Sequence, residues 1–156
     1  MSRALGLLAM SAIILASPAT AGPRPAFERI GQPSLNGAPL PFSDAVRVGD
    51  ILYLSGQIGV RPDGRLPPGI AAQARQVMDN IGAVLAKSGL GWSNVAKCTV
   101  MLDSIADWPA FNQIYVSYFP DKKFPARSAF GTDGLALGAL IEVECLAHAP
   151  ARGKAK

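Results

Sequence analysis

The spacing of apolar residues changes along the chain, and its first clear pattern is that of a β-hairpin. Two short runs rich in β-branched and apolar residues, 45–48 and 51–54, flank Gly49-Asp50, a two-residue turn signal. Residues 55–60 continue the second strand, and the glycines in that run indicate a bulge or a close approach of another backbone. A further short strand is expected near Phe27 to Ile30.

After a turn-rich loop, the apolar residues take up the period of a helix. They recur at helical spacing from Ile70, and Ser88-Gly89 ends this first helix. A second helix is expected from about Ile105 to Phe119, where Pro120 stops it. The apolar side of this second helix comprises Trp108, Phe111, Ile114, Tyr115, Tyr118 and Phe119.

Three later segments have the alternation of strands. The run 95–102 is expected to place Ala96, Cys98, Val100 and Leu102 on one face. Residues 124–128 lead into another strand. The last strand, 140–147, alternates Ile141, Val143 and Cys145 with Glu142 and Glu144.

The resulting order, β-β-α-β-α-β-β, predicts an α/β (α+β) fold. Two helices of modest length can cover one face of a single mixed β-sheet. The other face of the sheet then needs a different cover, and oligomerisation is the simplest one.

The first residues are typical of an export signal. Arg3 precedes the apolar run 4–16, and Pro18 ends that run before Ala19-Thr20-Ala21, a small-residue cleavage motif. A membrane anchor is less favoured, because the run is shorter than the roughly 20 residues that a spanning helix needs. We therefore expect a signal peptide at 1–21 and a secreted protein of the bacterial periplasm.

Charge and rare residues narrow the possible functions. The formal net charge is +4, and the basic residues are scattered, which does not favour nucleic-acid binding. His148 is the only histidine, so a histidine-based triad and a multi-histidine metal site are excluded. Export permits a disulfide between Cys98 and Cys145, whose strands could be neighbours. Because a disulfide between directly paired strand residues is strained, we expect both cysteines to stay unpaired.

Several runs occur together in the order and spacing of the RidA (YjgF) family, which the chain resembles from about Phe42 to Ala147. They are Ser55-Gly56-Gln57-Ile58, Ala71-Ala72-Gln73-Ala74-Arg75-Gln76 followed by Met78-Asp79-Asn80, Phe124-Pro125-Ala126-Arg127-Ser128, and Ile141-Glu142-Val143-Glu144. The resemblance implies a homotrimer whose fold is similar to that of bacillary chorismate mutase, with a ligand cleft at each subunit interface. We expect an extended segment at 22–41, a RidA-like domain at 42–150 and a basic tail at 151–156.

The same resemblance implies roles for individual residues. Arg127 would hold the carboxylate of a 2-imino or 2-enamino acid bidentately, and the backbone N–H of Ala129, where family members often carry Cys, would assist. Glu142 would take a proton from the attacking water. Glu144 points to the same sheet face, and only one of the two need line the cleft. The structural alternatives for the arginine are a salt bridge or a position in a subunit interface. For the glutamates the alternative is a solvated strand face, and the second glutamate could also be an interface residue.

Three more residues belong to the implied substrate-binding site. Asn112 matches an asparagine that reaches the cleft from a neighbouring subunit, and Gly56 would let a ligand approach the backbone. A plain surface asparagine and a bulge glycine are the alternatives. Phe42 stands where deaminase members commonly have a Tyr, and Phe cannot donate that hydrogen bond. No cofactor or metal is implied, because the imine is already an electrophile and water is the nucleophile.

The resemblance leads to two hypotheses of different class. The first is hydrolytic deamination of reactive 2-imino or 2-enamino acids to 2-keto acids and ammonia. The second is a non-catalytic trimeric module that binds a small carboxylate, which needs Arg127 but not Glu142. A ribonuclease or translation-inhibitor role, attached to some family members, is disfavoured by export and by the scattered charge. After cleavage of the signal, no stable membrane association is expected.

Overall fold

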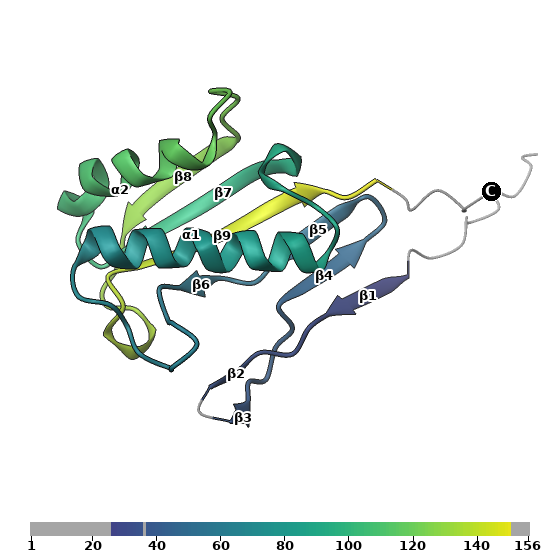
Figure 1. The fold of residues 1–156 in the computed structure, drawn as a ribbon, viewed down its shortest axis with the longest axis horizontal. Coiled ribbons are helices and arrows are strands. Elements are labelled where there is room, and N and C mark those ends of the chain that lie inside the picture. Colours follow the sequence, from purple (N-terminus) through teal and green to yellow (C-terminus); the bar gives the residue numbers. More distant parts are fainter. Residues whose placement is uncertain (1–25, 36, 151–156) are drawn as a thin grey trace, which may run out of the picture.

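The computed structural model describes residues 26–35 and 37–150, which form one main sheet, a small hairpin and two helices (Figure 1). The predicted signal peptide and basic tail lie outside these residues. The strands of the main sheet are β1 (Phe27–Ile30), β4 (Ala45–Val48), β5 (Ile51–Leu54), β6 (Gln57–Ile58), β7 (Val95–Leu102), β8 (Ala126–Gly131) and β9 (Ile141–His148). The small hairpin consists of β2 (Ser34–Leu35) and β3 (Ala38–Pro39), and the helices are α1 (Ile70–Lys87) and α2 (Trp108–Tyr115).

The main sheet is mixed. Its strand order is β1-β4-β5-β9-β7-β8, with β6 also paired to β9. The β7–β8 pair is parallel, and the connection between these two strands runs through α2. The other pairs are antiparallel. This arrangement confirms the predicted α+β fold and, with β6 as the continuation of β5, the β-β-α-β-α-β-β order from β4 onward.

The predicted hairpin and its bulge are both present. Strands β4 and β5 pair around Gly49, whose φ of 58° is in the left-handed region that favours glycine. Downstream, Tyr53 pairs with Leu146 and Gln57 pairs with Val143. Four residue steps on one strand (57 − 53) therefore face three on the other (146 − 143), so one extra residue is accommodated near Gly56.

The second helix is more interrupted than the sequence predicts. The α-helical part is Trp108–Tyr115, and single 3₁₀ turns, Ile105–Asp107 and Val116–Tyr118, flank it. Pro109 occupies the first turn, where the missing N–H costs no helical hydrogen bond. The helical segment ends before Pro120, which disfavours helical backbone at the residue that precedes it.

Both helices lie on the same face of the sheet (Figure 1). The core lies between them and the sheet, and it includes Leu52, Val77, Met78, Ile81, Leu85, Val100, Leu102, Phe111, Ile141 and Val143. Ala96 was expected on the same face of the strand as Cys98, Val100 and Leu102, and that prediction is wrong. A bulge between Val95 and Lys97 shifts the alternation, so that Val95 is buried and Ala96 is exposed.

The opposite face of the sheet carries no helix within the described residues. Its large apolar side chains Ile51, Tyr53 and Phe130 are 37%, 47% and 47% exposed. In the described part of the chain, no helix is long and apolar enough to cross a bilayer.

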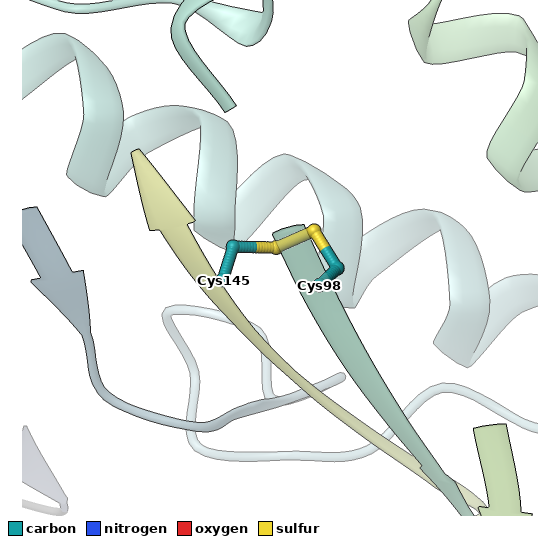
Figure 2. The surroundings of a disulfide bond; sticks show 2 residues. All are labelled: Cys98 and Cys145. Atoms are coloured by element: carbon teal, nitrogen blue, oxygen red, sulfur yellow. A yellow bond between two sulfur atoms is a disulfide. The ribbon is translucent and has the colours of Figure 1, made fainter. Parts of the chain in front are cut away.

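Cys98 and Cys145 form a disulfide, so the expectation that they stay unpaired is wrong (Figure 2). Strands β7 and β9 are neighbours, and the two cysteines are direct register partners. Their Cα atoms are 4.1 Å apart, and both side chains point into the core. The pairing of the two strands could not be read from either strand alone, and it brings the two sulfur atoms within bonding reach.

Candidate functional site

Arg127 lies on the helix side of β8. It is the register partner of Cys98, whose side chain points into the core under the helices. Its guanidinium carbon is 4.6 Å from the centre of the Tyr115 ring. The rings of Phe111 and Trp108 are 5.7 and 6.0 Å away. The guanidinium makes no hydrogen bond or ion pair with any residue that the structure describes. Its N–H donors are therefore available to a ligand.

Ala129 and Asn112 lie on the same side of the sheet as Arg127. Ala129 is two residues further along β8, opposite Val100, and is packed against the core. Asn112 is half-buried on α2, one helical turn after Trp108. The structure thus places three of the predicted substrate-binding residues, Arg127, Ala129 and Asn112, between α2 and the edge strand β8.

Glu142 lies on the open face of the sheet. Its side chain is half-buried on β9. Its register partner is Met101 on β7, and the register partner of Met101 on β8 is Phe130. Burial, and to a smaller extent the nearby charge of Glu144, raises the pKa of the Glu142 carboxyl above its ordinary value. A raised pKa fits a group that must take up and return a proton near neutral pH.

Gly56 is in direct contact with the Glu142 carboxylate. A Cβ at position 56 would lie 2.0 Å from Glu142 Oε1. The extra residue near Gly56 lets the backbone pass this close, so the absence of a side chain here has a structural reason. The Ser55 hydroxyl donates a 2.7 Å hydrogen bond to the Ser43 carbonyl. This bond ties the segment that carries Phe42, which is 45% exposed, to the Gly56 segment.

The predicted site residues therefore form two groups. Arg127, Ala129 and Asn112 lie on the helix side of the sheet, whereas Glu142 lies on the open side with Gly56 against it. Arg127 on β8 pairs with Cys98 on β7, which in turn pairs with Cys145 on β9. Glu142 is three residues from Cys145 along β9 (145 − 142). A single chain thus does not bring the arginine and the glutamate to one pocket.

Two features near these groups were not predicted as part of a site. The aromatic residues around Arg127 were assigned only to the apolar side of a helix. The signal that could have identified them is their i, i+3, i+7 spacing in the helix that precedes the Phe-Pro-Ala-Arg-Ser run. The second feature is a hollow of about 260 Å³ on the open face, lined by Tyr53, Leu54, Lys97, Thr99, Glu144, Cys145 and Leu146. Among the described residues, no group of three or more His, Cys, Asp or Glu could hold a metal ion.

Comparison with known proteins identifies the class of this molecule. The fold and the two residue groups define a small α+β domain, whose edge strand β8 carries an arginine that has no hydrogen-bonding partner among the described residues. The sequence model described as Endoribonuclease L-PSP matches residues 35–149. The chain belongs to this family, the RidA/YjgF group that its sequence resembles.

Curated relatives give the same result. The chain is 41% identical over 109 residues to the 2-iminobutanoate/2-iminopropanoate deaminase of Bos taurus, a match that covers 69% of this chain and 79% of the relative. It is 42% identical over 113 residues to the Homo sapiens deaminase of the same name, covering 71% and 82%. A third relative, Reactive Intermediate Deaminase A of Arabidopsis thaliana chloroplasts, is 39% identical over 109 residues, covering 69% and 58%.

Solved structures share the fold. The YjgF gene product of E. coli superimposes with a TM-score of 0.70 at 33% identity, covering 78% of this chain and 98% of that one. RidA from an Antarctic Psychrobacter gives a TM-score of 0.68 at 33% identity, covering 75% and 93%.

Proposed function

We propose that this protein hydrolyses 2-imino acids to 2-keto acids and ammonia. The observation that carries the proposal is the half-buried Arg127 guanidinium, which has no hydrogen-bonding partner in the described chain and lies in the family's Phe-Pro-Ala-Arg-Ser run. A buried cation without an anionic partner is costly, and a ligand carboxylate would supply that partner. The names of the relatives, which are deaminases of 2-iminobutanoate and 2-iminopropanoate, support this choice of ligand.

The reaction needs one bound water and one base. The carboxylate of the substrate binds Arg127, assisted by the Ala129 backbone N–H, and this fixes the position of the C=N carbon. Glu142 accepts a proton from the water as its oxygen bonds to that carbon. Glu142 returns this proton to the nitrogen, which gives a tetrahedral intermediate with one hydroxyl and one amino group. The hydroxyl proton then passes to the nitrogen, again by way of Glu142, as the C–N bond breaks, so that ammonia leaves and the 2-keto acid forms. The raised pKa of Glu142 suits it to both proton transfers.

We further propose that the site is formed between subunits of a homotrimer. Arg127 and Glu142 point to opposite faces of one sheet, so a pocket that contains both requires two chains. The open face of the sheet, with its exposed Ile51, Tyr53 and Phe130, offers the surface that such an assembly would cover. In this arrangement Arg127, Ala129 and Asn112 come from one subunit, and Glu142, Gly56 and Phe42 come from its neighbour.

The proposed location is outside the cytoplasm. The signal pattern at 1–21 is one support. The Cys98–Cys145 disulfide is a second support, because such bonds persist in oxidising compartments. An imine hydrolase at this location needs a source of imines there, such as an enzyme that oxidises amino acids.

A non-catalytic carboxylate-binding module is the second candidate, and Phe42 favours it. A phenyl ring cannot donate the hydrogen bond that a Tyr would give to ligand or water at this position. An RNA-cleaving role, which the family's name carries, is less favoured, because the chain has one histidine and no concentrated basic run among its described residues.

The deciding experiment measures ammonia release from imines generated in the assay by an amino-acid oxidase. We expect wild-type protein to accelerate release and Arg127→Ala to lose most of that acceleration at low substrate. Calorimetry with 2-oxobutanoate, the stable product, measures binding separately. If wild type binds the keto acid and never accelerates ammonia release, the binding-module function replaces the enzyme.

A further inference from the structure

The side chain of Arg127 is held by aromatic rings rather than by hydrogen bonds. We propose that Trp108, Phe111 and Tyr115 form an aromatic clamp around the Arg127 guanidinium. The three are positioning residues, because their rings hold the guanidinium in place. This inference rests on the proposed function and adds to it the device that holds the carboxylate-binding group in place.

The clamp follows from the geometry of one helix. Residues 108, 111 and 115 have i, i+3, i+7 spacing, so their side chains lie on one side of α2. That side faces β8, and the three ring centres are 6.0, 5.7 and 4.6 Å from the guanidinium carbon. These distances are within the range of cation–π attraction.

A clamp made of rings has a consequence that a salt bridge would not have. Aromatic rings attract a guanidinium through its flat faces, whereas its N–H donors lie in the guanidinium plane. The side chain can therefore be fixed while its donors stay available to a carboxylate. A protein carboxylate at this place would occupy the same donors and compete with the ligand.

The rings differ in their surroundings. Phe111 and Tyr115 are buried, at 0% and 3% exposure, whereas Trp108 is 43% exposed and forms the outer part of the clamp. The Tyr115 hydroxyl is buried and has no hydrogen-bonding partner among the described residues. The contact of Tyr115 with Arg127 is therefore made by its ring.

The test uses binding of 2-oxobutanoate by calorimetry and imine hydrolysis in parallel. Trp108→Leu should raise the Kd and lower kcat/KM by roughly three- to tenfold, the size of one cation–π contact. Trp108→Phe should restore part of the affinity. Phe124→Leu is the matched control, because Phe124 is 51% exposed and contacts the Phe119 ring edge to face instead of contacting Arg127.

A second measurement separates electrostatic positioning from simple packing. In a Trp92→Phe background, Trp108 is the only tryptophan, and fluorinated tryptophans can replace it alone. Fluorine weakens the negative face of the ring at nearly constant shape, so the Kd should rise stepwise with the number of fluorine atoms. In NMR spectra, the Arg127 Nε–H signal should lose an upfield ring-current shift in Trp108→Leu.

The outcomes distinguish the clamp from the proposed function. If wild type binds 2-oxobutanoate through Arg127, but fluorination leaves the Kd unchanged or Trp108→Leu lowers it, the clamp alone is overturned. If wild type neither binds the keto acid nor hydrolyses imines, the proposed function fails, and the clamp fails with it. A stepwise rise in Kd with no change in Phe124→Leu supports both.

Discussion

Arg127 and Glu142 lie on opposite faces of the same sheet, the first under α2 and the second on the open side. The two residues that the proposed chemistry needs together are thus separated by the thickness of the sheet in one chain. Symmetric assembly can bring one face of a subunit against a different part of its neighbour. This relationship makes shared sites a testable property of the protein.

The first prediction is complementation between inactive variants. Arg127→Ala and Glu142→Gln should each have low activity alone. The two variants are unfolded together in equal amounts and reassembled into random trimers. A site is intact when its arginine comes from a Glu142→Gln chain and its glutamate from an Arg127→Ala chain, so about a quarter of wild-type activity should be recovered. Steady-state ammonia release before and after mixing measures the recovery.

A mixture of wild type with the double variant provides the control. Shared sites would leave about a quarter of the activity, whereas sites inside single chains would leave about half, since half the chains remain complete. Absence of recovery in the first mixture, together with half activity in the second, would place the whole site within one subunit.

The second prediction concerns Gly56. In Gly56→Ala the new methyl group would lie 2.0 Å from Glu142 Oε1, so the carboxylate must move. We expect kcat to fall by roughly tenfold to a hundredfold, with little change in the Kd for 2-oxobutanoate, because displacement of a base slows proton transfer. Gly91→Ala is the control, since a Cβ there meets no atom within 4 Å. Equal rates for wild type and Gly56→Ala would remove Glu142 from the mechanism.

Local pattern was sufficient to predict most of the fold. The hairpin, the α1 helix and the alternation of β9 depend on neighbours in the sequence, and all three were predicted correctly. Pairing between distant strands is not encoded locally, which is why the Cys98–Cys145 bond was missed. The position of Ala96 failed for a related reason, because a one-residue bulge depends on the partner strand.

The sequence proposes residues for the candidate site but does not predict their arrangement. The family motifs give Arg127 and Glu142, and strand alternation places Glu142 and Glu144 on one face. Which face each strand turns toward the helices depends on the register of the whole sheet. The sequence therefore could not show that Arg127 and Glu142 point in opposite directions, nor that the aromatic side of α2 contacts Arg127.

The third prediction is a pH effect. The pKa of Glu142 is raised by burial and, second, by Glu144. Its carboxyl therefore stays protonated to a higher pH than an ordinary glutamate, and kcat/KM should fall as pH drops through the raised pKa. Glu144→Gln removes the smaller cause, so the pH below which kcat/KM falls should shift to a lower value. An unchanged pH dependence in Glu144→Gln, or activity that rises with acid, would contradict the assignment of Glu142 as the base.

The fourth prediction concerns Phe42. Phe42→Tyr adds a hydroxyl at a half-exposed position of the segment tied to Ser55. The new donor could contact ligand or water, so we expect the hydrolysis rate to rise or stay unchanged. Phe27→Tyr, at a 66% exposed position of β1, controls for a hydroxyl added elsewhere. A clear loss of kcat in Phe42→Tyr alone would show that this part of the site requires an apolar ring.

The last prediction concerns the disulfide. The Cys98–Cys145 bond joins residues 47 apart in the sequence, so it restricts the unfolded chain. Cys98→Ala/Cys145→Ala should lower the free energy of unfolding by about 2–4 kcal/mol, measured by urea titration at one protein concentration. A reductant should weaken wild type by a similar amount and leave the double variant unaffected, which separates loss of the bond from loss of core packing. Two free thiols in the purified protein, detected by alkylation and mass spectrometry, would show that the bond does not form.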